Sequence, residues 1–218
     1  MYRLIAFDLD GTLVDSRRDL AESVNEVLKS YGAAALPDHA VGTMVGDGAP
    51  TLLLRAFAAV GLERPADALA RFLAIYDARL LNHTRPYPGM RDTLEELAEG
   101  TSLAVLTNKP LSATRAILAG LDLARYFSEN AIVGGDGPFP RKPDPAGLQY
   151  LYARIGVPAG ETLFVGDSVI DWRTARNAST SICLARYGFG FEGFPLSDLA
   201  PADRVIDAPM ELPPLLRS

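Results

Sequence analysis

Two carboxylates that directly follow a short apolar run constrain the fold of this chain more than any other feature. Residues 4–7 are apolar, Asp8 and Asp10 come next, and Gly11 follows them. Alternate residues of an extended chain point to the same side, so Asp8 and Asp10 should face one cleft while Gly11 lets the backbone turn away. Two neighbouring anions repel each other unless a divalent cation lies between them or they share protons. We therefore expect metal binding or acid–base chemistry here.

Two other interpretations of the Asp-x-Asp-Gly pattern are a surface turn and a calcium loop. The calcium loop needs Asp or Asn at its fifth position, Gly at its sixth and Glu at its twelfth, where this chain has Thr12, Leu13 and Asp19. A surface turn is less favoured, because a hydrophobic strand leads into the carboxylates. In open α/β sheets, ligands bind just beyond the carboxyl ends of the strands.

Composition and charge exclude several classes of protein. The chain has 218 residues, 48% of them hydrophobic, which is enough for one core with an inserted smaller module. Its net charge of -6, without a cluster of Lys and Arg, argues against a nucleic-acid or anionic-membrane partner. Cys183 is the single cysteine and suits a reducing cytosol. The apolar runs are too short for a signal peptide or a membrane span, so we expect a cytoplasmic protein. We expect it to be a monomer or a homodimer.

The segment from residue 16 to residue 85 has a purely helical pattern. Apolar residues recur at three- and four-residue spacings after Ser16, and Gly32 is a plausible helix end. Three further helices should each begin at a proline, which the first turn of a helix tolerates. We expect a short helix from Pro37, one from Pro50 to Val60 and a longer one from Pro65 to Leu81. A stiff, turn-rich hinge at residues 85–89 should end the block. We therefore predict a helical cap at residues 16–85, inserted into a core formed by residues 1–15 and 86–218.

From Met90 onward, helical and strand patterns alternate. The expected helices are 91–99, 112–121, 145–155 and 172–177, and the expected strands are 103–106, 131–133, 162–165, 181–185 and 204–206. Strands separated by helices of this length are typical of right-handed βαβ units in a parallel sheet. The predicted fold class is α/β, with a Rossmann-like, doubly wound parallel sheet as the core and an all-helical cap inserted into it.

A polar cluster follows the expected strand at residues 103–106. Thr107, Asn108 and Lys109 offer a hydroxyl, an amide and backbone N–H groups at the start of a helix, which suit a phosphate oxygen. An ordinary helix cap is the alternative interpretation of Thr-Asn.

Two further clusters bring a cation and more carboxylates. Lys142 is followed by Pro143, and such rigid placement would let it neutralise both a phosphoryl group and a carboxylate; a surface lysine is the alternative. Asp167 and Asp171 follow another apolar strand and carry the hard oxygen ligands that Mg²⁺ prefers.

Together, these four clusters resemble the four motifs of the haloacid dehalogenase-like hydrolase superfamily in order, strand-end placement and residue type. The resemblance implies a phosphatase that forms an aspartyl-phosphate. It implies a nucleophile at Asp8, a general acid and base at Asp10, and phosphate binding by Thr107, Asn108 and Lys142, with Lys142 also catalytic. It further implies a Mg²⁺ cofactor held by Asp8, Asp10 (through its backbone carbonyl) and Asp167, with Asp171 as an additional metal-site carboxylate.

The cap and several short motifs resemble those of bacterial phosphoglycolate phosphatases within this superfamily. These motifs include Tyr87-Pro88-Gly89 and Gly134-Gly135-Asp136. The substrate to expect is a small phosphorylated metabolite, with 2-phosphoglycolate the first to test. Asp47 stands where that group favours Asn, and we expect it to face the substrate; Lys109 is a candidate for a compensating cation.

Two other functions remain open from the sequence. A phosphotransferase or mutase, similar to β-phosphoglucomutase, would keep Asp10 but needs a cap that binds a sugar and excludes water. A catalytically silent binding protein could keep the fold, although the complete set of Asp8, Asp10, Lys142 and Asp167 argues against it.

Overall fold

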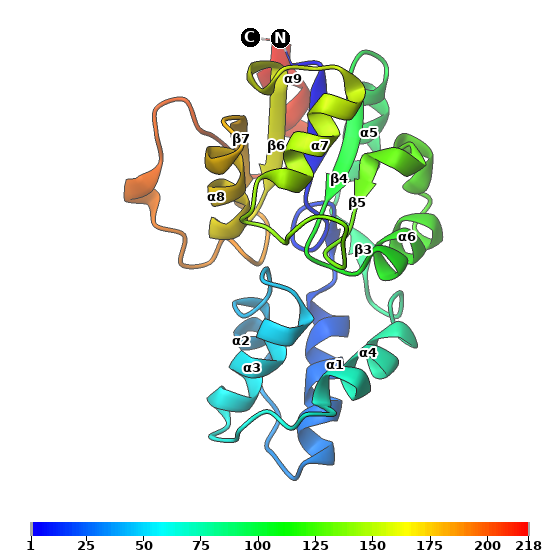
Figure 1. The fold of residues 1–218 in the computed structure, drawn as a ribbon, viewed down its shortest axis with the longest axis vertical. Coiled ribbons are helices and arrows are strands. Elements are labelled where there is room, and N and C mark those ends of the chain that lie inside the picture. Colours follow the sequence, from blue (N-terminus) through cyan, green and yellow to red (C-terminus); the bar gives the residue numbers. More distant parts are fainter. Residues whose placement is uncertain (1, 218) are drawn as a thin grey trace.

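The computed structural model describes residues 2–217 and contains a six-stranded parallel sheet (Figure 1). Its strands are β1 (Leu4–Phe7), β4 (Ser102–Leu106), β5 (Ile132–Val133), β6 (Thr162–Gly166), β7 (Ser181–Ala185) and β8 (Arg204–Ile206). They lie in the order β5-β4-β1-β6-β7-β8, and all neighbours pair in parallel. The predicted doubly wound parallel sheet is confirmed.

Helices cover both faces of this sheet. They are α5 (Met90–Ala98), α6 (Leu111–Gly120), α7 (Ala146–Ile155), α8 (Val169–Asn177) and α9 (Leu212–Arg217). Alternate residues of β1 point into two separate cores: Ile5 and Phe7 pack in the core with α5, α6 and α9, whereas Leu4 and Ala6 pack in the core with α7 and α8. A strand covered on both faces has to be apolar throughout, which explains the continuous run of residues 4–7.

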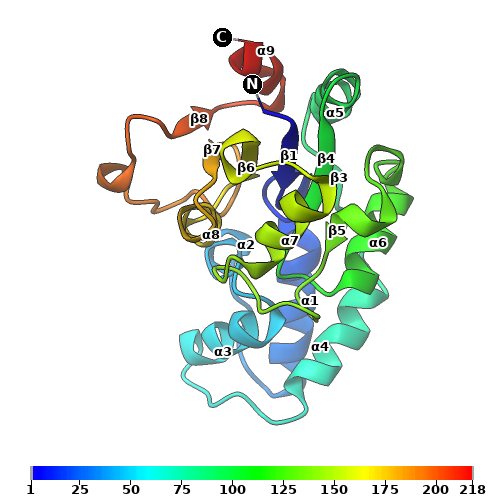
Figure 2. The same ribbon diagram turned by 45° about the horizontal axis from the view of Figure 1, so that its top comes forward.

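A second group of helices lies in residues 17–84, which we call the helical lobe. It contains α1 (Arg17–Ser30), α2 (Asp38–Gly42), α3 (Ala49–Ala59) and α4 (Ala68–Asp77). Their apolar side chains form a third core that includes Val24, Leu53, Phe57 and Phe72. In Figure 1 the lobe lies beyond the carboxyl end of β1, whereas β1 begins beside α9 at the opposite end of the molecule (Figure 2).

A short antiparallel ribbon joins the helical lobe to the sheet. It consists of β2 (Val14–Asp15) and β3 (Arg85–Pro86), which pair with each other. Beside it, the buried Asp19 accepts hydrogen bonds from His83 N and Thr84 N, so the returning chain is held against α1. The sequence predicted only a turn-rich hinge at this place, because two paired residues are too few to produce a recognisable strand pattern.

Three helices differ from the sequence prediction, and one of them, α8, begins at Val169 rather than at residue 172. The helix expected to run from Pro65 to Leu81 begins at Ala68 and ends at Asp77, and turns flank it. Helix α9 was not predicted, because Pro213 and Pro214 lie in its first turn, where proline is tolerated but masks the periodicity. The division into a core (residues 1–15 and 86–218) and a cap (residues 16–85) stays a prediction. Residues 1 and 218, the outer bounds of the core, lie outside the described residues.

The order of the strands places a ligand site between β1 and β6. The chain moves outward from β1 to β4 and β5, and then crosses to β6 and continues outward on the other side. Ligands of open α/β sheets bind at such a switch point, beyond the carboxyl ends of the strands. Asp8 follows β1 and Asp167 follows β6, so the switch point falls between these two carboxylates.

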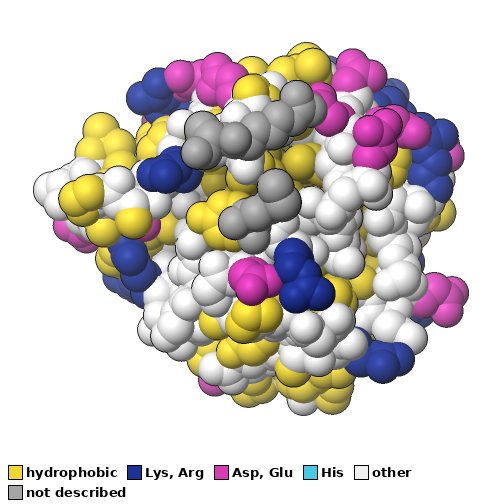
Figure 3. Space-filling view, turned by 90° about the horizontal axis from the view of Figure 1, so that it is seen from above, with side chains coloured by type: hydrophobic (Ala, Val, Ile, Leu, Met, Phe, Trp, Pro, Cys, Tyr) yellow, Lys and Arg dark blue, Asp and Glu magenta, His cyan; other side chains and the backbone are white. Residues whose placement is uncertain are grey.

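The end of the molecule remote from the helical lobe carries mixed charges. In Figure 3, Lys and Arg side chains alternate with Asp and Glu side chains around this end. Exposed ion pairs such as Arg3–Glu161 and Arg125–Glu95 mix the two signs. Among the described helices, none is both long and apolar enough to cross a membrane.

Candidate active site

Lys142 connects two carboxylates at the switch point. Its Nζ lies 2.8 Å from Asp8 Oδ1 and donates a hydrogen bond of 2.6 Å to Asp171 Oδ1. Burial by itself would lower the pKa of Lys142, but Asp171 and Asp8 outweigh it, so the pKa is raised and the ammonium stays charged. Asp171 is fully buried, and its other oxygen accepts from Ser168 N and Oγ at the start of α8. Asp171 therefore both caps α8 and holds Lys142 toward Asp8.

Asp8, Asp167 and Asp171 form a buried acidic group suited to a cation. One carboxylate oxygen from each lies within 4.8 Å of the others. Apart from the ion pair with Lys142, Asp8 Oδ1 has no hydrogen-bond partner in the described part of the chain, although it is buried. Burial raises the pKa of Asp8 to about 7, and burial together with the charges of Asp171 and Asp8 raises the pKa of Asp167 well above its usual value. This group could hold a metal ion.

Two glycine-containing backbone segments pass close to the side chain of Asp167. Asp167 Oδ2 accepts from Gly190 N at 2.7 Å. A Cβ on Gly11, which has a φ of +87°, would lie 1.9 Å from this same oxygen, and a Cβ on Gly188 would lie 2.2 Å from the Gly11 carbonyl oxygen. Only glycine fits at these two positions, which brings the segment after β7 against the acidic group.

The carboxylate of Asp10 points to a different set of partners. Asp10 Oδ1 accepts from Ser16 Oγ at 2.5 Å, and Asp10 Oδ2 lies 3.0 Å from Lys109 Nζ. Lys109 Nζ in turn donates to the hydroxyl of Tyr76 on α4 at 2.8 Å. The Asp10 side chain is not in the acidic group, so ligation by its backbone carbonyl, as the family resemblance implies, stays a prediction.

Thr107 and Asn108 are both buried at the end of β4. Thr107 Oγ1 accepts from Lys109 N at 3.2 Å. The Asn108 side chain makes a reciprocal pair with the Lys142 backbone, accepting from its N at 2.8 Å and donating to its O at 3.0 Å. Asn108 Nδ2 also donates to Gly46 O in the helical lobe at 2.8 Å. These contacts position Lys142 and the Gly46 segment; direct binding of phosphate by Thr107 or Asn108 stays a prediction.

Asp47 is placed apart from the other predicted site residues. Its carboxylate lies 2.6 Å from Arg55 Nη2 on α3. Its neighbours Gly46 and Gly48 line the cavity described next, whereas Asp47 is not among the lining residues. A contact between Asp47 and the substrate stays a prediction, and the ion pair reduces any repulsion that this carboxylate would exert.

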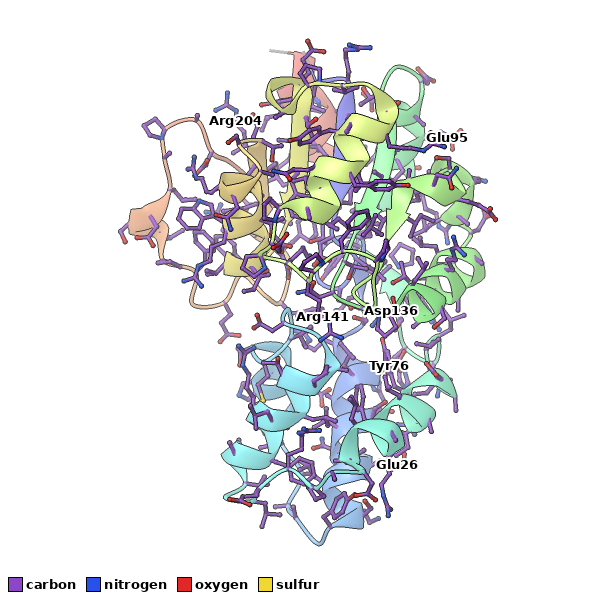
Figure 4. All side chains as sticks on the ribbon, viewed as in Figure 1. Glu26, Tyr76, Glu95, Asp136, Arg141 and Arg204 are labelled. Atoms are coloured by element: carbon purple, nitrogen blue, oxygen red, sulfur yellow. The ribbon has the colours of Figure 1, made fainter. Side chains whose placement is uncertain are left out.

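A cavity lies between the carboxyl ends of the strands and the helical lobe. The sheet side contributes polar residues, including Asp8, Asp10 and Thr107. The lobe contributes mainly apolar residues, including Leu52 and Phe72, and Tyr76 lies at the boundary between the two parts (Figure 4). The two sides together enclose a site with carboxylates at one end and an apolar wall at the other.

Sequence reasoning missed three contributors to this site. Tyr76 looked like an ordinary core residue of a helix, and no local pattern showed that its hydroxyl meets Lys109. Phe189 and Gly190, which line the cavity, belong to a glycine-rich segment, Gly188-Phe189-Gly190, that follows β7. Glycines just after a strand, at the same edge of the sheet as Asp8, are the signal that would have indicated this loop.

Residues 5–185 match the haloacid dehalogenase-like hydrolase family, and the chain belongs to that family. The predicted family is therefore confirmed, whereas the roles of the strand-end carboxylates and the lysine stay predictions.

Several relatives carry a more specific name. The chain is 44% identical over 201 residues to a phosphoglycolate phosphatase of Rhodospirillum rubrum, covering 88% of this chain and 83% of that protein. It is 38% identical over 215 residues to a phosphoglycolate phosphatase of Haemophilus influenzae, covering 94% of both. The crystal structure of a predicted phosphoglycolate phosphatase from Haemophilus somnus superposes with a TM-score of 0.90 at 34% identity, covering 99% of this chain and 98% of that one.

Proposed function

We propose that this protein hydrolyses a small phosphate monoester, 2-phosphoglycolate, through a phosphorylated aspartate at Asp8. The observation that carries this proposal is the position of Asp8, buried at the switch point with Lys142 Nζ 2.8 Å from its carboxylate. Family membership and relatives named phosphoglycolate phosphatase support the reaction and the substrate.

Asp8 is suited to act as the nucleophile because a cation accompanies it. A carboxylate that attacks a phosphoryl group has to overcome the repulsion between two anions, and a buried ammonium offsets that repulsion. Lys142 is held in place by three hydrogen bonds: its Nζ donates to Asp171, and its backbone N and O both bond to the Asn108 side chain. Such fixed placement keeps the attacking oxygen and the phosphorus in line.

Asp10 is suited to move the proton. In the first step it would protonate the ester oxygen that leaves, and in the second it would take a proton from the water that hydrolyses the aspartyl-phosphate. Ser16 and Lys109 hold its two oxygens and fix the direction of the carboxylate. Thr107 Oγ1 accepts from Lys109 N, which leaves the hydroxyl proton available for a phosphoryl oxygen.

The residues present fit a divalent cation, which we propose to be Mg²⁺. Asp8 and Asp167 would hold it, together with the Asp10 carbonyl, and Asp171 would orient the surroundings by binding Lys142 and Ser168. When bound, Mg²⁺ would neutralise the phosphate charge and the carboxylates that burial otherwise disfavours.

Phosphate release from 2-phosphoglycolate by the purified protein, with Mg²⁺, tests the proposal. We expect turnover by the wild type and none by Asp8→Asn, which has nearly the same shape but is a poor nucleophile. A second alcohol added as an acceptor distinguishes hydrolysis from transfer, since a phosphotransferase would yield a new phosphate ester. Absence of phosphate release from 2-phosphoglycolate, with other esters turned over, would contradict the proposed substrate.

A further inference from the structure

A single lysine provides the positive charge on the wall of the cavity. Among the described residues that line it, Lys109 is the only Lys, Arg or His, whereas Asp8, Asp10, Asp77 and Asp167 are acidic. Lys142 is not among the lining residues, and its ammonium is paired with Asp8 and Asp171. A substrate that carries a second anion besides its phosphate therefore has one side-chain cation within the cavity to meet.

Lys109 is buried and has room for one more partner. Its side chain is 4% exposed and lies 3.0 Å from Asp10 Oδ2, and its Nζ donates to the Tyr76 hydroxyl at 2.8 Å. An ammonium has three hydrogens, and the interactions of the described residues give it these two polar partners. Burial alone would lower the pKa of Lys109, but Asp10 and Tyr76 outweigh it, so the pKa is raised and the charge is kept.

Tyr76 brings a second donor to the same place. Burial raises the pKa of Tyr76 to about 12, so the hydroxyl keeps its proton at neutral pH. Because this hydroxyl accepts its hydrogen bond from Lys109, the proton can be donated elsewhere. The Lys109 ammonium also lies 4.4 Å from the centre of the Tyr76 ring, which stabilises the cation within the apolar wall.

The structure of the substrate places its carboxylate beside the general acid. In 2-phosphoglycolate the carboxylate carbon is two bonds from the ester oxygen that leaves. A residue that binds this carboxylate must therefore be a neighbour of the residue that protonates the ester oxygen. Lys109 is in contact with Asp10, to which we assign that proton, and it lines the cavity on the same side.

We propose that Lys109, supported by Tyr76, binds the substrate carboxylate and selects phosphate esters that carry an anion next to the ester oxygen. This inference rests on the proposed function, since it assigns the specificity of the same site. It also makes the helical lobe part of substrate selection, because Tyr76 belongs to α4 and approaches the cavity from that side (Figure 4).

Three esters of similar size measure this selection: 2-phosphoglycolate, ethyl phosphate, which lacks the carboxylate, and the phosphate ester of 3-hydroxypropanoate, whose carboxylate is one carbon further away. The readout is the ratio of kcat/KM for 2-phosphoglycolate to that for each other ester. The active fraction of a preparation cancels in this ratio, so partial misfolding does not change it. We expect the wild type to prefer 2-phosphoglycolate to both.

Lys109→Met should lower the ratio of 2-phosphoglycolate to ethyl phosphate by roughly 10- to 100-fold, the range for a hydrogen-bonded charge. Tyr76→Phe should lower it by roughly 2- to 10-fold, as expected for one neutral hydrogen bond. Lys29→Met, at the exposed lysine of α1, is the matched control and should leave the ratio unchanged.

If Lys109→Met turns over neither ester, binding replaces turnover as the readout. The Kd values of 2-phosphoglycolate and ethyl phosphate are then measured with Mg²⁺ in the inactive variant Asp8→Asn and in the double variant that also carries Lys109→Met. Equal losses for both esters would mean that Lys109 only positions Asp10, and would overturn this inference alone. A wild type without preference for 2-phosphoglycolate over ethyl phosphate would overturn both the inference and the proposed substrate.

Discussion

The carboxylate of Asp47 lies 2.6 Å from the guanidinium of Arg55, eight residues further along the chain. This ion pair changes what the substitution Asp47→Asn should do. An unpaired Asp47 about 5 Å from a substrate carboxylate would cost ~3 kcal/mol at an effective dielectric near 20, or on the order of a hundredfold in kcat/KM. With Arg55 beside it, we expect Asp47→Asn to change the preference for 2-phosphoglycolate over ethyl phosphate by less than about tenfold. Arg55→Met should lower this preference, since it leaves Asp47 unpaired.

Asp10→Asn should lower kcat by roughly 10²- to 10⁴-fold, the usual effect of losing a general acid and base. The loss in the first step should depend on the alcohol that leaves. p-Nitrophenol leaves readily without a proton, so phosphoenzyme formation from p-nitrophenyl phosphate should be affected less than formation from ethyl phosphate. Rapid-mixing measurements across a series of esters give this dependence. An equal defect for every ester would remove Asp10 from proton transfer.

Metal removal should stop the reaction, and Mg²⁺ should restore it better than Ca²⁺. Ca²⁺ accepts more ligands at longer distances, which would let the Asp8 carboxylate move out of line. Phosphate release in EDTA, and after readdition of each ion, provides the measurement. Full activity in EDTA would contradict the assignment of Asp8 and Asp167 as ligands.

Metal binding should also depend on pH. Burial raises the pKa of Asp8 from 3.8 to about 7, so the metal-free folded protein binds this proton more tightly than the unfolded chain does. The protonated Asp8 carboxyl therefore stabilises the folded protein fully below about pH 4, and this contribution to the free energy of unfolding is lost as the pH rises through about 7. Because Mg²⁺ needs the ionised carboxylate, it should raise Tm more at pH 8 than at pH 6. In Asp8→Asn, this difference between the two pH values should shrink.

Gly188→Ala should destabilise the protein and impair the acidic site together. A Cβ at this position would lie 2.2 Å from Gly11 O and 2.3 Å from Asp167 Cβ, so the loop after β7 would have to move away. Overpacking of this kind costs about 1–3 kcal/mol, which corresponds to a Tm lower by roughly 3 to 10 °C. Gly160→Ala is the matched control, because its Cβ would meet nothing within 4 Å. Equal Tm values for the two variants would show that the loop does not need glycine there.

Most of the sheet could be predicted from the sequence because its signals are local. The buried strands are short apolar runs, and three of the polar clusters follow one of them directly, at Asp8 after β1, Thr107 after β4 and Asp167 after β6. The alternation of strands and helices then indicates a parallel sheet, in which the carboxyl ends of the strands lie at one edge. This is why residues as far apart as Asp8 and Lys142 could be expected in one cleft.

Side-chain pairing across the cavity could not be predicted in the same way. The contact between Tyr76 and Lys109 depends on how α4 packs toward the sheet, which no local pattern determines. The ion pair of Asp47 with Arg55 depends in turn on the shape of the loop before α3. Likewise, the approach of Gly188 to Gly11 joins segments whose relation appears only when the sheet is complete.

Chemical trapping of the phosphorylated residue tests the central claim most directly. Asp10→Asn should form the aspartyl-phosphate from p-nitrophenyl phosphate but hydrolyse it slowly, so the intermediate should accumulate with Mg²⁺ present. Borohydride reduces an acyl phosphate to the alcohol, which converts a phosphorylated Asp to homoserine, and peptide mass spectrometry then locates it. We predict substrate-dependent homoserine at position 8, and none when Asp8→Asn is also present. Continued turnover without homoserine at position 8, or homoserine at position 167 instead, would contradict the assignment of Asp8 as the nucleophile.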